Sequence, residues 1–324
     1  MAMQAIRTHF HPVAPPQPVE FLLNEIDGLP AEQTLIDAGE FAIIQARAPQ
    51  IPRLLEEIGR LREISFRDAG EGTGKSVDLD QFDDTYIHLF AWNRARKELV
   101  GAYRFAVTDE IVNEYGLPGL YTHSLFEYSQ TLLDRLGAAV ELGRSFVRPE
   151  YQRGFQPLLL LWKGISRFIS RNPRYRVLFG PVSISNEYSA LSRQLIVDFL
   201  EARTYLPELA SVLKPRNPFR RIPPADWSAE LGAWALAQTV KDLGSLISGI
   251  EPDKKGIPVL LKHYLRLGGK VIGFNVDHEF SDVLDGLIVV DLLNTEKQML
   301  VRLMGEQAAR EFLLRHQQPC AAGV

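Results

Sequence analysis

The stretch from Ala139 to Arg203 constrains the fold most, because it alternates between strand and helix patterns. Apolar residues at strand spacing occupy 139–147, and an apolar helix is expected from about Pro157 to Ser170. A second strand at 176–185 and a second helix at 187–203 follow. This alternation predicts two parallel strands joined by a right-handed crossover. We therefore expect an α/β (α+β) fold built on a central sheet.

The first of these strands carries two opposite charges in its middle. Glu141 and Arg144 are three residues apart, so on a regular strand they would point to opposite faces. Gly143 lies between them, and a glycine inside a strand often marks a bulge. One extra residue at Gly143 would turn both side chains to one face and place a base and a cation beside one substrate. A buried ion pair without chemistry is the alternative.

An inward-facing arginine marks the first long helix, which has Pro52 in its first turn and follows a short buried strand at 41–46. Arg62 continues the apolar stripe of this helix, and Phe66 follows one turn later. A charge on a core-facing edge needs a partner. Arg62 either extends to the rim of the core or meets acidic residues inside a site.

The glycine-rich stretch Ala69–Ser76 imitates a phosphate-binding loop, but a charged helix precedes it and an acidic run follows it. We therefore expect a flexible loop rather than a nucleotide site. The acidic run consists of Asp78, Asp80, Asp83 and Asp84. It could chelate a divalent ion, but it lacks the glycine and the distal glutamate of a calcium loop. It could equally attract a cationic amine or form a solvated face.

Two strands at 86–92 and 99–107, joined by the polar turn 93–97, predict a hairpin. Arg104 interrupts the apolar pattern of the second strand, so it is either paired structurally or functional. After short helices at 108–137 and the central block, residues 204–225 are basic and proline-rich. Four of these could dock an acidic partner or anionic lipid, or simply lie in an exposed loop: Lys214, Arg216, Arg220 and Arg221.

The two terminal regions add further expected elements. Residues 1 to about 30 predict an extended or partly disordered lead, and the C-terminal region predicts helices near 227–248, 257–267 and from 296, with strands at 270–274 and 287–292.

Net charge is -4, which argues against a general nucleic-acid role. One cysteine excludes a disulfide framework, and nothing approaches a spanning helix or a signal peptide. We expect a cytoplasmic protein, and peripheral contact with the inner face of the membrane stays open.

Taken together, these motifs resemble the GNAT-like N-acyltransferases that draw on acyl carrier protein. That group comprises the ornithine-lipid N-acyltransferases with their hemolysin-like relatives, and the acyl-homoserine-lactone synthases. The resemblance covers roughly residues 40–205. The matching positions are Arg62 with Phe66, Asp78 with Asp80 and Asp83, His88 with Leu89, Val100 with Gly101 and Arg104, and Glu141 with Arg144.

The resemblance implies a GNAT-like central mixed twisted sheet flanked by helices, with a C-terminal extension of helices and two further strands. It implies an extended lead over 1–35, an acyltransferase core over 36–205, an extension over 206–315 packed on that core, and a tail over 316–324.

The implied reaction moves a fatty acyl group from an acyl carrier protein thioester to the amine of an amino acid or related acceptor. The product would be an N-acyl amino acid or a lyso-aminolipid. Glu141 would be the base, and an N–H near Gly143 would stabilise the oxyanion. Arg144 and Arg104 would hold the acceptor's carboxylate. The other expected substrate-binding residues are Arg62, Phe66, Asp80 and Asp83.

The donor prediction rests on a departure from the acetyl-CoA-using GNAT enzymes. Their pyrophosphate loop has a second glycine where this chain has Gln156, and Pro157 offers no N–H. A phosphopantetheine arm on an acidic carrier protein needs less of that loop, and the four basic residues of 214–221 would dock the carrier. No metal and no permanently bound cofactor are expected. An acyl-CoA-dependent GNAT enzyme, or a non-catalytic protein that binds an acylated carrier or a lipid surface, is the alternative.

Overall fold

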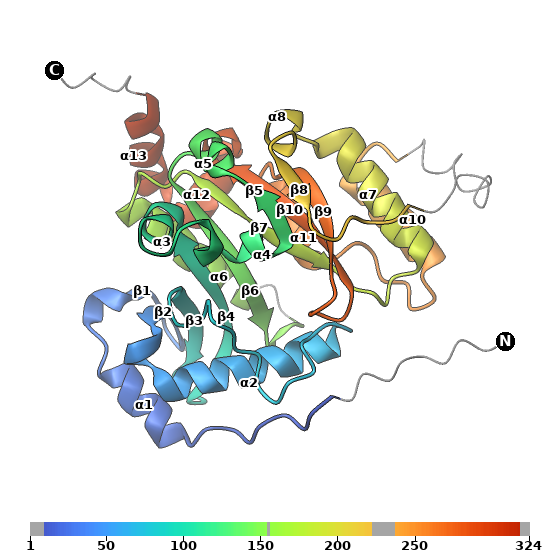
Figure 1. The fold of residues 1–324 in the computed structure, drawn as a ribbon. Helices are drawn as coiled ribbons and strands as arrows, with labels where there is room; N and C mark the ends of the chain where they lie inside the picture. The colour runs from blue at the N-terminus through green and yellow to red at the C-terminus, as the bar shows by residue number, and fades with distance from the viewer. Residues whose placement is uncertain (1–9, 154–155, 222–236, 318–324) are drawn as a thin grey trace. The chain divides into compact units, whose positions relative to one another are not determined.

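The structure is a computed structural model that describes residues 10–153, 156–221 and 237–317 (Figure 1). It divides into two compact units, and each is described by itself. The first comprises Met1–Phe105, Arg144–Ile165 and Glu279–Ser281, and the second comprises the remaining residues. Strand β6 (Ala139–Val147) contributes to both, because the division falls between Gly143 and Arg144. None of the described helices is long and apolar enough to cross a membrane.

The first unit contains four antiparallel strands in the order β1-β2-β3-β4, followed by the second half of β6. The strands are β1 (Thr34–Ala38), β2 (Phe41–Arg47), β3 (Ile87–Asn93) and β4 (Glu98–Val107). The predicted hairpin is β3–β4, and it is confirmed; its register places His88 opposite Arg104. Beside β4, the N–H of Arg148 donates to the carbonyl of Val100 at 2.9 Å. The hairpin forms at the predicted position because both of its strands are rich in aromatic and β-branched residues.

Three helices accompany these strands: α1 (Val19–Asp27), α2 (Pro52–Asp68) and the first part of α6 (Gln156–Arg171). Pro52 lies in the first turn of helix α2, as predicted. Helix α6 lies against β2 and β3, because a Cβ on Gly164 would come within 2.5 Å of Ile43. The prediction of an extended lead was wrong for α1. Pro18 precedes an amphipathic run that buries Leu22, which supplies the packing that a disordered lead lacks.

The second unit contains the sheet order β6-β7-β10-β9, with β7 (Val177–Ile184), β9 (Lys270–Asp277) and β10 (Val283–Asp291). The parallel pairing of β6 with β7 is confirmed, but it spans only the three residues Ala139–Glu141. On its other side β7 pairs with β10 over its whole length. A small sheet joins β5 (Phe126–Tyr128) to β8 (Leu213–Pro215). The large mixed sheet flanked by helices is the predicted fold class.

Most helices of the second unit follow the predicted pattern with shifted boundaries, but residues 207–210 form a helix and 213–215 a strand within the stretch 204–225 that was predicted to be irregular. The helices are α3 (Thr108–Tyr115), α4 (Tyr121–Leu125), α5 (Gln130–Leu136), α7 (Ala190–Thr204), α8 (Pro207–Ala210), α10 (Val240–Ile250), α11 (Val259–Arg266), α12 (Lys297–Met304) and α13 (Glu306–Gln317). Helices α7 and α10 lie side by side (Figure 1). The helix expected near 227–248 is α10 in its described part, and residues 222–236 lie outside the described ranges.

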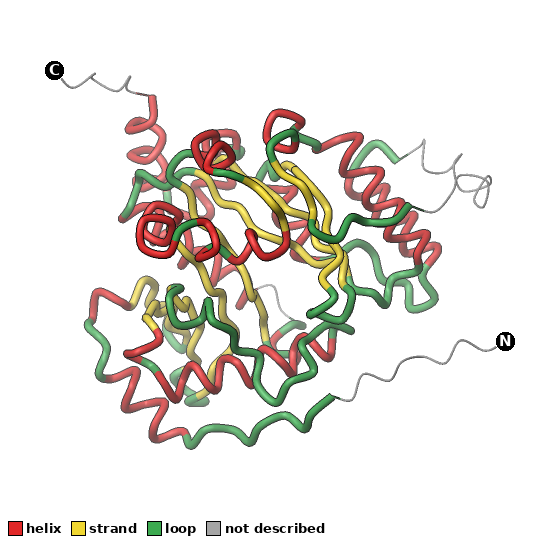
Figure 2. The backbone as a smooth tube through the Cα atoms, viewed as in Figure 1, coloured by secondary structure: helices red, strands yellow, loops and turns green. Residues whose placement is uncertain are grey.

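Residues 69–86, which join α2 to β3, form no helix or strand (Figure 2, in green). This loop has 18 residues and carries the acidic run. Loops of more than about 12–15 residues without secondary structure are uncommon in compact domains and are usually functional or disordered. Ion pairs between the aspartates of this loop and arginines of neighbouring elements hold it in place.

Candidate active site

Six charged side chains of the first unit form one group, here called the ion cluster: Arg62, Asp78, Asp80, Asp83, Arg104 and Arg144. They come from helix α2, the loop 69–86, and strands β4 and β6. Three positive and three negative charges balance one another. The carboxylates face guanidinium groups rather than one shared point, and no group of metal-ligating side chains occurs among the described residues. The cluster is therefore an ion-pair network.

Arg62 is the innermost member of the ion cluster. Its side chain is fully buried, and its Nη1 donates at 3.1 Å both to the carbonyl of Asp78 and to Oδ1 of Asp83. The apolar stripe of α2 dictates this placement, because Arg62 continues that stripe into the core. Of the two possibilities left open by the sequence, the structure shows the meeting with acidic residues.

Arg104 binds two aspartates at once. Its Nη1 lies 2.5 Å from Oδ1 of Asp80 and 2.9 Å from Oδ2 of Asp83, while Nη2 donates to Oδ2 of Asp80 at 2.9 Å. Burial alone would raise the pKa of Asp83, but Arg62 and Arg104 outweigh it and hold that pKa well below its usual value. In the same way, Arg104 outweighs burial and lowers the pKa of Asp80. Both carboxylates are ionised at neutral pH.

His88 borders the ion cluster as a neutral group. Its Nε2 lies 2.8 Å from the carbonyl oxygen of Asp83, and the ring is fully buried. Burial lowers the pKa of His88 to about 4, with Arg62 adding to the effect and Asp83 opposing it. The uncharged ring leaves the charge balance of the cluster unchanged.

Arg144 adopts the left-handed backbone conformation, with φ of 48°. The backbone irregularity expected at Gly143 therefore falls one residue later. The Nε atom of Arg144 lies 3.4 Å from Oδ2 of Asp78, and Nη2 lies 3.5 Å from Oδ2 of Asp80. Its guanidinium carbon sits 4.7 Å from the centre of the Phe280 ring. Such a conformation is uncommon outside glycine, and it directs this side chain to the two aspartates.

Only Asp80 and Arg144 reach the surface of the ion cluster. Their side chains are 23% and 10% exposed, whereas the other four members are at most 2% exposed. One anion and one cation, 3.5 Å apart, thus stand at the open edge of an otherwise closed network. These two side chains are therefore the members of the ion cluster that solvent reaches.

The glycine-rich stretch binds its own carboxylate. Glu63 is fully buried, and its carboxylate accepts hydrogen bonds from the N–H groups of Thr73 and Gly74 and from the Thr73 hydroxyl. Arg67 holds the same carboxylate at 2.7 Å. These N–H groups, which in a nucleotide site would face phosphate, are occupied. This supplies the physical reason for the expectation that the stretch is not a nucleotide site, although the loop is anchored rather than flexible.

Glu141 lies in the second unit and is almost fully buried. Its two carboxylate oxygens accept hydrogen bonds from the N–H groups of Tyr121 at 3.0 Å and Thr122 at 2.7 Å, at the start of α4. The Thr122 hydroxyl in turn lies 2.7 Å from the Tyr128 hydroxyl. Burial raises the pKa of Tyr128, and the charge of Glu141 adds to the effect. The catalytic role of Glu141 stays a prediction.

Gly143 stands beside open space, since a Cβ built on it would meet no atom within 4 Å. The hydrogen-bonded register of β6 with β7 ends just before it, at Glu141 paired with Phe179. The register of β6 with β7 therefore includes Glu141 but not Gly143 and Arg144, the other two predicted catalytic residues. The role of a backbone N–H near Gly143 stays a prediction.

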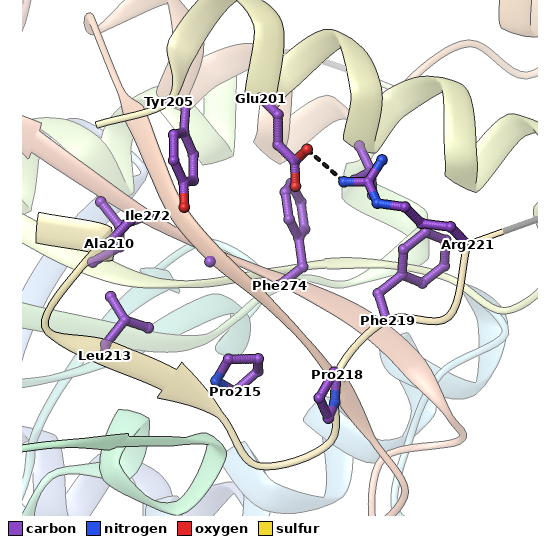
Figure 3. Close-up of a pocket in the computed structure, with 12 residues that line it drawn as sticks. Glu201, Tyr205, Ala210, Leu213, Pro215, Pro218, Phe219, Arg221, Ile272 and Phe274 are labelled. Carbon is purple, nitrogen blue, oxygen red and sulfur yellow. Dashed lines mark hydrogen bonds and ion pairs between the residues drawn. The ribbon is translucent and has the colours of Figure 1, made fainter. Parts of the chain in front are cut away.

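The basic residues predicted to dock a carrier protein are all exposed. Arg221, however, is ion-paired with both Asp198 and Glu201, and the side chain of Arg216 donates to the carbonyl of His123. Figure 3 shows the Arg221–Glu201 pair at a pocket of about 230 Å³ that is otherwise mainly apolar. Arg221 and Arg216 are thus engaged within the chain, and the docking role of the four basic residues stays a prediction.

The donor loop is described only in part, because Gly154 and Phe155 lie outside the described ranges. Gln152 and Arg153 are exposed, and α6 begins at Gln156. Pro157 therefore falls in the first turn of α6, where it removes one of the N–H groups that a helix start offers to phosphate.

Several residues of the site escaped the sequence analysis. Phe280 reaches Arg144 and Phe66 from the turn between β9 and β10, more than 200 positions from Phe66 in the sequence. Glu63 looked like an ordinary polar position of α2. Tyr121 and Thr122 hold Glu141 through backbone groups, which carry no sequence signal. The signal that could have indicated the burial of Glu63 is its place on α2, directly after the inward-facing Arg62.

Comparisons with known proteins give a consistent set of relatives. A family model described as acetyltransferase (GNAT) domain matches residues 61–163. A glycine N(alpha)-acyltransferase of Bacteroides thetaiotaomicron is 33% identical over 264 residues, which covers 76% of this chain and 77% of the relative. A second one, of Phocaeicola vulgatus, is 31% identical and covers 74% and 76%. An L-ornithine N(alpha)-acyltransferase of Rhodobacter capsulatus is 28% identical and covers 72% and 83%.

Proposed function

The chain belongs to the GNAT acyltransferase family, and from this membership we propose that it transfers a fatty acyl group to the α-amine of a free amino acid. The observation that carries the proposal is the pair Asp80 and Arg144 at the open edge of the ion cluster. The relatives are named N(alpha)-acyltransferases of glycine and of L-ornithine, and these names support the same class of acceptor.

A free amino acid carries an ammonium group and a carboxylate on one carbon, which fits this pair. The Asp80 carboxylate would accept hydrogen bonds from the ammonium, and the Arg144 guanidinium would bind the carboxylate. Each interaction involves two charged groups, which makes it stronger than a neutral hydrogen bond. The ion cluster behind the pair fixes both side chains before the acceptor arrives, so that little ordering cost remains.

Arg104 receives a different role from the one expected at first. It is fully buried and already engages Asp80 and Asp83. An acceptor's carboxylate at Arg104 would have to displace one of these anions from the core. We therefore assign Arg104 to holding Asp80 in place, and we assign Arg62 to holding Asp83 and the loop 69–86. The acceptor's carboxylate is left to Arg144 alone.

We propose Glu141 as the proton acceptor, the role that the resemblance implies. An ionised carboxylate only accepts hydrogen bonds, which matches its two N–H donors. The acceptor's ammonium must first lose one proton, and the free amine then attacks the thioester carbon. The new C–N bond replaces the C–S bond, and the thiolate leaves with the second proton of the amine. An N–H near Gly143 would stabilise the oxyanion of the intermediate.

For the donor we propose an acyl group on the phosphopantetheine arm of an acyl carrier protein. Pro157 in the first turn of α6 weakens the site that the pyrophosphate of free coenzyme A would need. Lys214 and Arg220 are exposed and suit an acidic carrier. This proposal is tested by measuring kcat/KM with the same acyl chain carried either by the carrier protein or by coenzyme A. Higher kcat/KM with the carrier supports it, and equal or lower kcat/KM contradicts it.

The acceptor site is tested with purified protein, an acyl thioester and glycine, with mass spectrometry of the product. Asp80→Asn should raise the KM for the amino acid about 10- to 100-fold, since a charge-assisted bond contributes about 1.5–3 kcal/mol. Asp84→Asn is the matched control, because Asp84 is an exposed aspartate of the same loop. An unchanged KM in Asp80→Asn, or an equal loss in the control, would contradict the assignment.

A further inference from the structure

We infer that Phe280, in the turn between β9 and β10, restricts the acceptor to amino acids with very small side chains, glycine above all. The inference rests on the proposed function, because it concerns the acceptor bound between Asp80 and Arg144. It adds a specificity-determining residue from a part of the chain far from the motifs that carry the resemblance.

Phe280 belongs to the first unit although its flanking strands belong to the second, since Glu279–Ser281 group with the ion cluster. The ring is 4% exposed. Its centre lies 4.7 Å from the guanidinium carbon of Arg144 and 5.0 Å from the centre of the Phe66 ring, at an interplanar angle of 86°. One side of Arg144 is thus covered by an aromatic ring that a second ring supports.

The turn that carries Phe280 is fixed in position. The Ser281 hydroxyl donates to the carbonyl of Gly72 at 2.8 Å, in the loop that Glu63 anchors. Ser281 and Asp282 both adopt the left-handed conformation, with φ of 57° and 55°. Such turns hold a defined path, so the Phe280 ring cannot move away from Arg144 without breaking these contacts.

The position of the ring determines what the acceptor can carry on its α-carbon. Asp80 and Arg144 are only 3.5 Å apart, so an amino acid that binds both has its α-carbon against this pair. A side chain on that carbon starts within a few bond lengths of the Phe280 ring and of Phe66 behind it. Each added carbon would have to push the supported ring aside, which a well-packed site resists.

The charge environment points to the same class of acceptor. A side chain with its own ammonium, such as that of ornithine, would place a second cation near Arg144 and over the aromatic pair of Phe280 and Phe66. Asp80 would already hold the α-ammonium, and the buried Asp78 and Asp83 face arginines, so the ion cluster offers no exposed carboxylate to a second ammonium. An uncharged and minimal side chain is favoured on both grounds.

The test measures kcat/KM for glycine, alanine and ornithine with wild type and Phe280→Ala. One methylene in a pocket discriminates by about 10- to 200-fold. We expect wild type to prefer glycine, and Phe280→Ala to lower the glycine-to-alanine and glycine-to-ornithine ratios at least about 10-fold. The gain should appear mainly in the KM of the larger acceptors. Phe280→Leu should give an intermediate ratio, and it serves as the readout if Phe280→Ala does not fold.

Phe82→Ala is the control for general loosening. Phe82 is also buried, and its ring centre lies 5.6 Å from the guanidinium carbon of Arg104. Its loss should slow all acceptors alike and leave both ratios within about twofold. Phe280→Ala ratios that stay within twofold of wild type, or a wild type that takes ornithine as well as glycine, overturn the inference alone. A wild type that acylates no amino acid overturns the proposed function instead.

Discussion

At the scale of single residues, the ion cluster is stable because every buried charge has a partner, so removing one partner should be costly. Arg62→Ala would leave Asp83 with one guanidinium fewer inside the core. Breaking a buried pair in this way typically costs about 3–5 kcal/mol. Urea denaturation measures the loss. Arg53→Ala on the same helix should cost less than about 1 kcal/mol, because the Arg53–Glu56 pair is largely exposed. Similar losses in the two variants would contradict the role given to Arg62.

His88 predicts a pH dependence of stability. Its pKa is lowered to about 4 in the folded protein from an ordinary value near 6.5, so between these values the unfolded chain binds a proton that the folded chain does not. Stability should therefore fall as the pH drops from about 6.5 to 4, by up to about 1.4 kcal/mol per pH unit. Denaturation midpoints at pH 7.5, 6 and 5 measure this slope.

His88→Gln should flatten that slope whatever its effect on stability at pH 7.5. His263 has a similarly lowered pKa of about 4, again mainly from burial, and it remains in the variant, so part of the slope should persist. The lowered pKa of Asp83 adds a further loss of stability at more acidic pH, as that carboxylate becomes protonated. An identical slope in wild type and His88→Gln would show that His88 does not titrate as described.

Glu141→Gln should destabilise the protein as well as slow it. The carboxylate accepts two backbone N–H groups, whereas a glutamine side chain has only one acceptor and would turn an N–H₂ toward the other donor. Leaving one buried N–H unsatisfied costs about 1–3 kcal/mol. Thermal unfolding detects this. If the variant keeps wild-type stability and loses turnover, Glu141 acts in the proton transfer; if it keeps both, neither assignment holds.

At the scale of secondary-structure elements, the close approach of β4 to β6 in the first unit depends on Gly101. A Cβ at this position would come within 2.4 Å of the carbonyl oxygen of Phe146, which is backbone and cannot yield cheaply. Gly101→Ala should therefore cost about 1–3 kcal/mol or more. The comparison is Gly249→Ala in α10, where a Cβ meets nothing within 4 Å and better helix propensity should be neutral or stabilising. Thermal unfolding of both variants separates crowding from a general effect of alanine.

The sequence predicted most elements, because their hydrophobic periodicity is local. The hairpin β3–β4, helix α2 and the parallel pair β6–β7 appear at or near the expected positions. Helix α1 was missed, since the prolines before it suggested an extended chain. A bulge was expected at Gly143, whereas the left-handed backbone conformation occurs at Arg144, whose side chain contacts Asp78 and Asp80.

At the scale of the whole molecule, the sequence motifs of the ion cluster were found but their partners were not. Arg62, Arg104 and Arg144 stood out as charges in apolar segments, and Asp80 and Asp83 stood out as part of an acidic run; both are local signals. Their pairing depends on a loop of 18 residues and on a turn near residue 280, and no local pattern encodes such long-range contacts. The expected domains, with a core over 36–205, stay a prediction. The two compact units are a division of the chain by contacts and do not test those boundaries.

The central claim is that Asp80 and Arg144 recognise a free amino acid by its two charges. The most direct measurement compares acylation rates of glycine and glycinamide, which has the amine but no carboxylate. We predict that wild type acylates glycine with a kcat/KM about 10- to 100-fold higher, and that Arg144→Gln brings the two acceptors to within about twofold. Equal rates for both acceptors in wild type, or a preference for glycine that survives Arg144→Gln, would contradict the account.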